Sequence, residues 1–189
     1  TTLQNIGDIV EKGWNVLSIM LLNGSESLSS NIDILDLIAE ADTVKYVEAE
    51  DFNYDGGLYK TFEEVGSGGA YKGLRAVSGV DFNNSGNASQ KYRVIPGNHP
   101  GMVESMWDAE RNGFDMEVDF KVGWQDNGDW YNYTRDFPED GSYVVFGRFS
   151  SGGARVNNKL SIVTSDPTEE AQTVEDVGTF KGPATGGWN

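Results

Sequence analysis

The sequence predicts an all-β protein, and more closely an antiparallel β-sandwich. Short segments rich in β-branched and aromatic residues recur along the chain, and clusters of Gly and Asn separate them. The 24 glycines suit a fold with many tight turns. With 189 residues, the chain is long enough for one sizeable hydrophobic core and short for two complete sandwich domains.

The first half of the chain contains one clear strand and two ambiguous apolar segments. Residues 14–22 and 31–38 are apolar enough to form either buried strands or short helices, and periodicity alone does not distinguish these. Residues 44–52 are predicted to form a strand. Residues 83–108 are rich in Asn, Gly and Pro and are predicted to form a long loop.

The second half contains the strongest strand signals. Apolar and charged residues alternate strictly over residues 114–122, which is typical of a half-buried antiparallel strand. Residues 130–133 follow an Asp-Asn-Gly-Asp turn, and residues 142–149 follow a Pro-Glu-Asp-Gly turn. Two more strands are predicted at residues 159–163 and 174–180.

A short motif occurs twice, once near each end of the chain. Residues 5–9 (Asn-Ile-Gly-Asp-Ile) lead to Gly-Trp-Asn at residues 13–15, and residues 176–180 (Asp-Val-Gly-Thr-Phe) lead to Gly-Trp-Asn at residues 187–189. The chain therefore resembles the tail of one repeat followed by the head of the next. A chance match over so short a stretch is the alternative.

Composition and charge argue against several classes of partner. The 14 basic and 30 acidic residues give a net charge of −16, which argues against nucleic acid or an anionic membrane. No apolar run approaches the length of a membrane span. The absence of cysteine excludes a disulfide scaffold and a thiolate metal site. The acidic balance suits an extracellular protein in salty or calcium-containing surroundings, or simply a soluble acidic surface.

The sequence predicts a protein that is not an enzyme. The single histidine, His99, lies in an Asn-His-Pro-Gly stretch that is typical of an exposed turn. No Gly-x-Ser-x-Gly elbow, metal-binding His pair or phosphate-binding loop is present. Asp and Glu are abundant, and nothing singles out a pair for glycoside hydrolysis.

Several segments in order resemble the family-6 and family-35 carbohydrate-binding modules, which are β-sandwiches of the jelly-roll type. The resemblance covers about residues 46–189. It is carried by residues 47–52 (Val-Glu-Ala-Glu-Asp-Phe), 122–124, 128–133 (Gly-Asp-Trp-Tyr-Asn-Tyr), 137–143, 178–180 and 186–188. It implies a non-catalytic module, extracellular or at a cell surface, that binds polysaccharide.

The chain departs from this family at its C-terminal end. Members continue past Gly-Gly-Trp with further strands and finish on an Asn-Ile-Asp strand, whereas the matching segment here is residues 14–38. The sequence therefore looks circularly permuted, with a main body at residues 46–189 and terminal strands in residues 1–45. Those strands either fold back or complete a neighbour's sandwich. Head-to-tail exchange gives filaments, so a structural subunit of an extracellular filament or surface assembly is the alternative function. A cut from a tandem array is the simpler explanation.

The resemblance implies a structural calcium site and a sugar-binding surface. The Glu-x-Glu pair and the Asp of the terminal strand correspond to Glu48, Glu50 and Asp33, whose hard oxygens suit Ca²⁺; a solvated acidic strand edge is the alternative. The sugar-contacting positions correspond to Trp124, Trp188 and Asn31. Aromatic rings stack on the C–H face of a pyranose while amides bond its hydroxyls.

Two further features of the sequence bear on these sites. Trp107, in the long loop, is a candidate wall of the sugar site, although all of these tryptophans could instead pack in the core or a subunit interface. Residues 51–56 (Asp-Phe-Asn-Tyr-Asp-Gly) open like an EF-hand loop, but the twelfth position is Phe62. We expect residues 51–56 to form a polar turn.

Overall fold

The computed structural model describes residues 4–10, 13–21, 30–39, 44–65, 70–85, 102–104, 120–123, 125–137 and 140–187. Of the described residues up to 46, and of residues 102–104, 120, 141 and 142, it describes the backbone alone. The described chain consists of strands and turns with a single short helix, α1 (Phe62–Val65). The prediction of an all-β protein is therefore confirmed.

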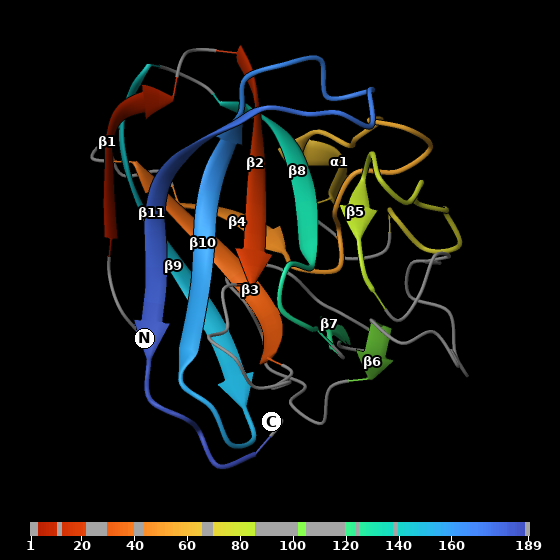
Figure 1. Ribbon diagram of the computed structural model, residues 1–189. Coiled ribbons are helices and arrows are strands. Elements are labelled where there is room, and N and C mark those ends of the chain that lie inside the picture. The colour runs from red at the N-terminus through yellow and green to blue at the C-terminus, as the bar shows by residue number, and fades with distance from the viewer. Residues whose placement is uncertain are drawn as a thin grey trace.

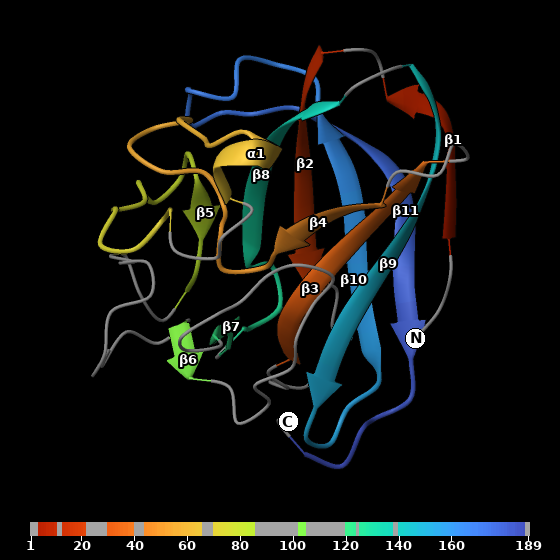
Figure 2. The same cartoon turned by 180° about the vertical axis from the view of Figure 1, so that it is seen from behind.

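The strands form two antiparallel sheets (Figures 1 and 2). The six-stranded sheet contains, in order, β1 (Gln4–Val10), β9 (Gly141–Ser151), β3 (Ser30–Ala39), β7 (Phe120–Val122) and β6 (Met102–Glu104), with β4 (Val44–Glu48) also paired to β3. The five-stranded sheet contains, in order, β11 (Val174–Gly182), β10 (Val156–Val163), β2 (Gly13–Leu21), β8 (Trp130–Phe137) and β5 (Phe82–Asn83).

Both ambiguous N-terminal segments are strands, and both lie inside a sheet. β2 lies between β10 and β8, with Leu17 opposite Tyr133 and Ile19 opposite Leu160. β3 lies between β9 on one side and β4 and β7 on the other. Adjacent apolar residues, such as Val16 and Leu17 in β2 or Ile34 and Leu35 in β3, break the alternation in both strands, which explains why periodicity alone did not identify them.

The hydrophobic core lies between the two sheets. Val47, Tyr143 and Val145 of the six-stranded sheet belong to one buried cluster with Tyr131, Tyr133, Phe137, Leu160 and Phe180 of the five-stranded sheet. The rings of Phe137 and Tyr143 cross between the sheets at 5.0 Å, edge to face, a geometry that aromatic rings favour. Each fully buried side chain of this size contributes about 1.5–3 kcal/mol through removal of apolar surface from water.

Strand boundaries differ from the expected ones where turns intervene. The expected strand at residues 44–52 ends at Glu48, because the Asp51 amide donates to the Glu48 carbonyl at 3.0 Å and closes a turn. Of residues 114–122, only β7 lies within the described chain. The expected loop at residues 83–108 contains β6, and most of its remainder lies outside the described residues.

The two copies of the repeated motif take different places. The first copy forms β1 of the six-stranded sheet and the start of β2 in the five-stranded sheet. The second copy forms much of β11 at the edge of the five-stranded sheet, and then Gly187 forms a bridge with Ser151 at the end of β9. The same short sequence thus connects the two sheets at two points of the fold.

Candidate functional site

Two carboxylates of the predicted calcium site are buried. Glu48, the last residue of β4, is 3% exposed, and Glu50 in the following turn is fully buried. Burial of a carboxylate is costly unless positive charge and hydrogen bonds compensate for lost water, and a second carboxylate nearby adds repulsion. The burial of both side chains therefore argues against the alternative of a solvated acidic strand edge.

The turn that carries these glutamates is held against β8. The Tyr133 hydroxyl donates to the Ala49 carbonyl at 2.7 Å, and the Arg135 guanidinium donates to the Asp51 carbonyl at 2.6 Å. Both side chains are fully buried, and Arg135 also lies over the ring of Tyr71. Hydrogen bonds to the backbone on each side of Glu50 therefore fix the turn's position.

The sheet register brings the third predicted ligand to the same place. Ile34 of β3 pairs with Glu48 of β4, and Asp33 directly precedes Ile34. The three positions thus meet within one chain, although the side chain of Asp33 lies outside what the structure describes. Among the described side chains, no group of three or more His, Asp or Glu forms a metal site. Calcium at these residues stays a prediction.

Residues 51–56 form a turn, as the sequence suggested. Tyr54 and Leu58 exchange two backbone hydrogen bonds of 2.8 Å, which closes a tight hairpin. Asp55 (φ 51°) and Gly56 (φ 83°) adopt left-handed conformations, which Asp and Gly tolerate. The Asn53 amide is used elsewhere, because it bonds Thr134 of β8 at 2.8 Å.

A buried carboxylate fixes this hairpin. Asp81 is fully buried and accepts backbone hydrogen bonds from Gly56 (3.0 Å), Gly57 (2.6 Å) and Val77 (2.8 Å). Burial raises the pKa of Asp81, and the three amide donors offset part of that rise. All three donors are backbone amides, and they belong to two separate loops. Asp81 therefore has a structural role, because it holds these loops together.

The predicted sugar-contacting residues fall partly within the described chain. Trp107, Trp124 and Trp188 lie outside the described residues, as does His99. Asn31 lies on β3 and pairs with Ser150 of β9. Gly187, which precedes Trp188 in the sequence, pairs with Ser151. Asn31 and Gly187 therefore pair with adjacent residues of β9. We expect their backbones to lie about two strand spacings, or about 10 Å, from each other.

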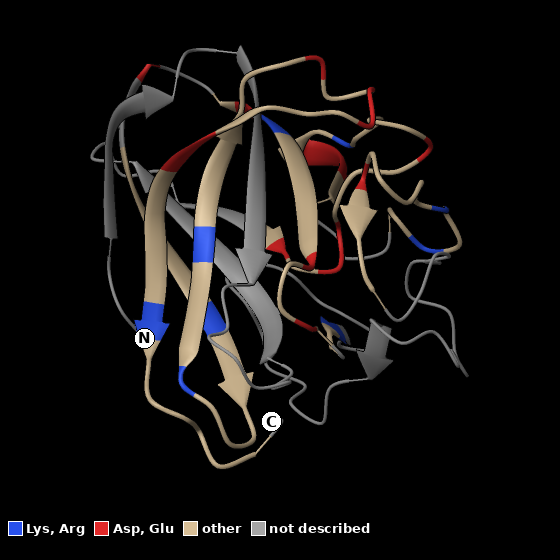
Figure 3. Ribbon diagram, in the orientation of Figure 1, with Lys and Arg blue, Asp and Glu red and all other residues tan. Residues whose placement is uncertain are grey.

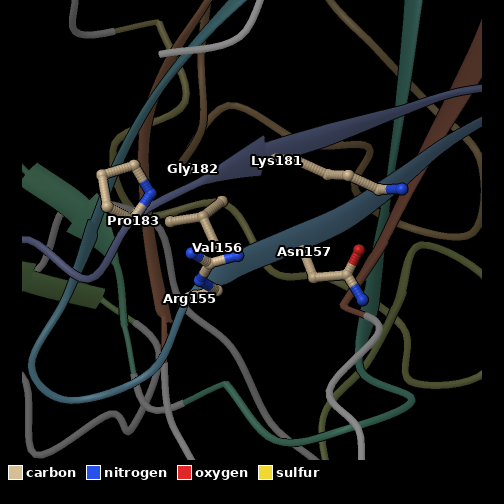
Figure 4. A pocket seen from close by; sticks show the side chains of 6 residues that line it. All are labelled: Arg155, Val156, Asn157, Lys181, Gly182 and Pro183. Carbon is tan, nitrogen blue, oxygen red and sulfur yellow. The ribbon is translucent and has the colours of Figure 1, made fainter.

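A surface groove lies beside this end of β9, and the sequence reasoning missed it. The groove has a volume of about 460 Å³ and is lined by the start of β10, the end of β11 and the residue after it: Arg155, Val156, Asn157, Lys181, Gly182 and Pro183 (Figure 4). A smaller recess of about 100 Å³ shares four of these residues and reaches Phe149, Phe180 and Thr185. The Thr185 amide donates to the Ser151 carbonyl at 3.1 Å, so the chain passes from the groove directly to the end of β9.

The distribution of acidic residues in the sequence indicates where this groove lies. The chain has 30 acidic residues, yet residues 141–165 and 177–189 contain none. Those two stretches supply β9, β10, most of β11 and every residue of the groove. A gap in the acidic residues is thus a signal for a surface that differs from the rest of the protein.

A buried amide lies next to the groove. Asn158 of β10 is fully buried, and neither its amide nitrogen nor its amide oxygen has a hydrogen-bond partner. It pairs with Phe180 across the sheet and lies two residues from Val156, and both of those residues line the recess. Buried amides without partners are rare, and each lowers the free energy of unfolding, so Asn158 is not explained by packing alone.

Comparisons with known proteins identify no relative. No protein-family model, no curated protein and no solved structure matches the chain. Within the described part of the chain, none of the helices has the length and apolar character needed to cross a membrane.

Proposed function

We propose that this protein is a non-catalytic, extracellular carbohydrate-binding module with a jelly-roll β-sandwich fold. The observation that carries the proposal is the convergence on β9: Asn31 pairs with Ser150, and Gly187 pairs with Ser151. Asn31 and Gly187, the residue that precedes the proposed platform Trp188 in the sequence, thereby pair with adjacent residues of one strand. A binding site assembled from distant segments needs this kind of convergence.

The groove supports the same function. Its volume of about 460 Å³ lies in the range of small-ligand sites, about 300–1,000 Å³. Val156 and Pro183 provide apolar surface for the C–H face of a sugar, and Asn157 provides an amide for hydroxyl groups. The chain leads from this groove through Thr185 to Trp188, the proposed stacking platform.

Binding to immobilised polysaccharides tests the proposal. Wild type should bind at least one polysaccharide saturably, and Trp188→Ala should weaken that binding about 5- to 30-fold, because a stacked ring contributes about 1–2 kcal/mol. Near-ultraviolet circular dichroism and the melting temperature must show that the variant is folded. If a folded Trp188→Ala variant binds as tightly as wild type, Trp188 is not the platform; if no polysaccharide binds, the function is wrong.

We further propose that Glu48, Glu50 and Asp33 bind a structural Ca²⁺. The support is the burial of both glutamates and the register that sets Asp33 beside the partner of Glu48. Calcium at about 100 times its Kd would add about 2.7 kcal/mol to the free energy of unfolding. For a chain of this length that gain raises the melting temperature by about 5–11 °C.

Paired variants test the calcium site. Calcium should raise the melting temperature of wild type and should have no effect on E48Q/E50Q, because the amides keep the shape of the side chains without their charge. E169Q/E170Q removes the same charge from two exposed residues of the β10–β11 loop and should keep the full calcium effect. An equal calcium effect in all three proteins would place the ion elsewhere.

A filament or surface-assembly subunit joined by strand exchange is the second candidate function. It rests on β2 and β3, which come from residues 1–45 and supply inner strands of both sheets, here within one chain. If such strands came from a neighbour, each subunit would complete both sheets of the next, and the open-ended chain of subunits would form a filament. The mass of the native particle, measured by light scattering, tests this second function. A mass near the 20.7 kDa of one chain argues against strand exchange, whereas filaments support it.

A further inference from the structure

The groove carries two cationic side chains on a strongly acidic chain. Arg155 and Lys181 are both exposed and both line the groove. In Figure 4, Lys181 extends along the strands in one direction, while Arg155 and Pro183 lie at the other end of the group. Two positive groups separated along a groove match a polymer that carries negative groups at intervals.

The two stretches of sequence that build the groove differ in charge from the rest of the chain. The stretches that build it, residues 141–165 and 177–189, contain no Asp or Glu. Figure 3 shows Lys and Arg on the parts of β10 and β11 near the groove, while the acidic residues of β11 lie towards its other end. At physiological salt the Debye length is about 8 Å, so more distant carboxylates are largely screened from a ligand in the groove.

The rest of the groove suits a sugar better than a bare anion. Val156 and Pro183 add apolar surface to the lining of the groove, and the adjoining recess reaches the rings of Phe149 and Phe180. A guanidinium binds the paired oxygens of a carboxylate or a sulfate with two parallel hydrogen bonds, and an ammonium binds them as a point charge. Apolar surface flanked by two cations therefore complements an acidic sugar unit in a chain.

We propose that this groove binds acidic polysaccharides, with Arg155 and Lys181 pairing the carboxylate or sulfate groups of nearby sugar units. The inference rests on the proposed glycan-binding function and adds its substrate class. It also assigns a specificity role to two residues that the family resemblance did not single out. The groups common to all such ligands are a pyranose ring and an attached anion.

Matched pairs of polymers test the substrate class by calorimetry at 0.15 M salt. Polygalacturonate is compared with its fully methyl-esterified form, and dextran sulfate is compared with dextran. The charged member of at least one pair should bind about tenfold or more tightly than its neutral partner, and the pair that responds identifies carboxylate or sulfate as the recognised group. Equal binding of charged and neutral members overturns the inference and leaves the proposed function intact, whereas absence of all binding overturns both.

Charge-neutralising variants test the two residues. R155Q/K181Q should raise the Kd for the preferred charged polymer at least about tenfold, because two charge-assisted contacts are lost. K72Q/R75Q makes the same change of net charge at two exposed residues outside the groove and should leave the Kd within about twofold of wild type. If both double variants weaken binding equally, the effect is one of net charge, and the groove is not the site.

Discussion

The hydrogen bond between Tyr133 and the Ala49 carbonyl links β8 to the proposed calcium site. Tyr133→Phe removes the hydroxyl alone, at a position where both Tyr133 and Ala49 are fully buried. A buried carbonyl that loses its donor costs about 1–3 kcal/mol. For a chain of this length the melting temperature should therefore fall by about 2–12 °C.

The same change should also weaken calcium binding, because Ala49 separates Glu48 from Glu50. Tyr131→Phe is the matched control: Tyr131 is 1% exposed and accepts a hydrogen bond from Asn84 at 3.2 Å, away from the glutamates. Urea unfolding with and without calcium, together with calcium calorimetry, measures both effects. We expect both variants to lose stability and only Tyr133→Phe to lose calcium affinity. Equal calcium affinity in the two variants would refute the idea that this bond positions the site.

Three further predictions concern stability. Burial raises the pKa of Tyr71 from 10.0 to about 12. Because the folded pKa is the higher one, this contribution to stability is fully present below pH 10 and is lost as the pH rises towards 12, a fall of about 3 kcal/mol in the free energy of unfolding. The urea midpoint should fall over that window and fall less in Tyr71→Phe; identical slopes would contradict the assignment. Gly57→Ala should cost about 1–3 kcal/mol, because Gly57 has φ 95° and its new Cβ would lie 2.9 Å from Cγ2 of Thr168. Gly128→Ala, with φ 92° and open space, should cost less; equal losses would rule out the contact. Asn158→Leu should raise the free energy of unfolding by about 1–3 kcal/mol, because it removes a buried amide without partners; a loss of stability would mean that the amide is satisfied in solution.

Local patterns predicted most of the strands. The turn signals before residues 130–133 and 142–149 locate β8 and β9, since turn chemistry acts over a few residues and does not depend on distant partners. The left-handed residues Asp55 and Gly56 likewise mark their own turn. Local chemistry did not decide the segments that became β2 and β3, because adjacent apolar residues, such as Val16 and Leu17 or Ile34 and Leu35, break the alternation that marks a strand.

The candidate sites were predictable only in part, because contacts between distant segments of the chain create them. Glu48 and Glu50 are adjacent in sequence, so their pairing was visible. Their burial was not, because it depends on Tyr133 and Arg135, which reach the turn from another sheet. Arginine is among the residues least often buried, so nothing in the sequence suggested that Arg135 is fully enclosed. The groove joins the ends of two strands that only the fold brings together.

The position of β2 has a consequence for how the protein is made. Leu17 pairs with Tyr133, and Ile19 pairs with Leu160, so a strand synthesised early acquires its two neighbours only when most of the chain is complete. Such pairing of distant segments slows folding, because the entropy of a long loop is lost before any contact forms. During synthesis this apolar strand has no partner from its own sheet until β8 and β10 follow, and unpaired strands in that state are prone to aggregation.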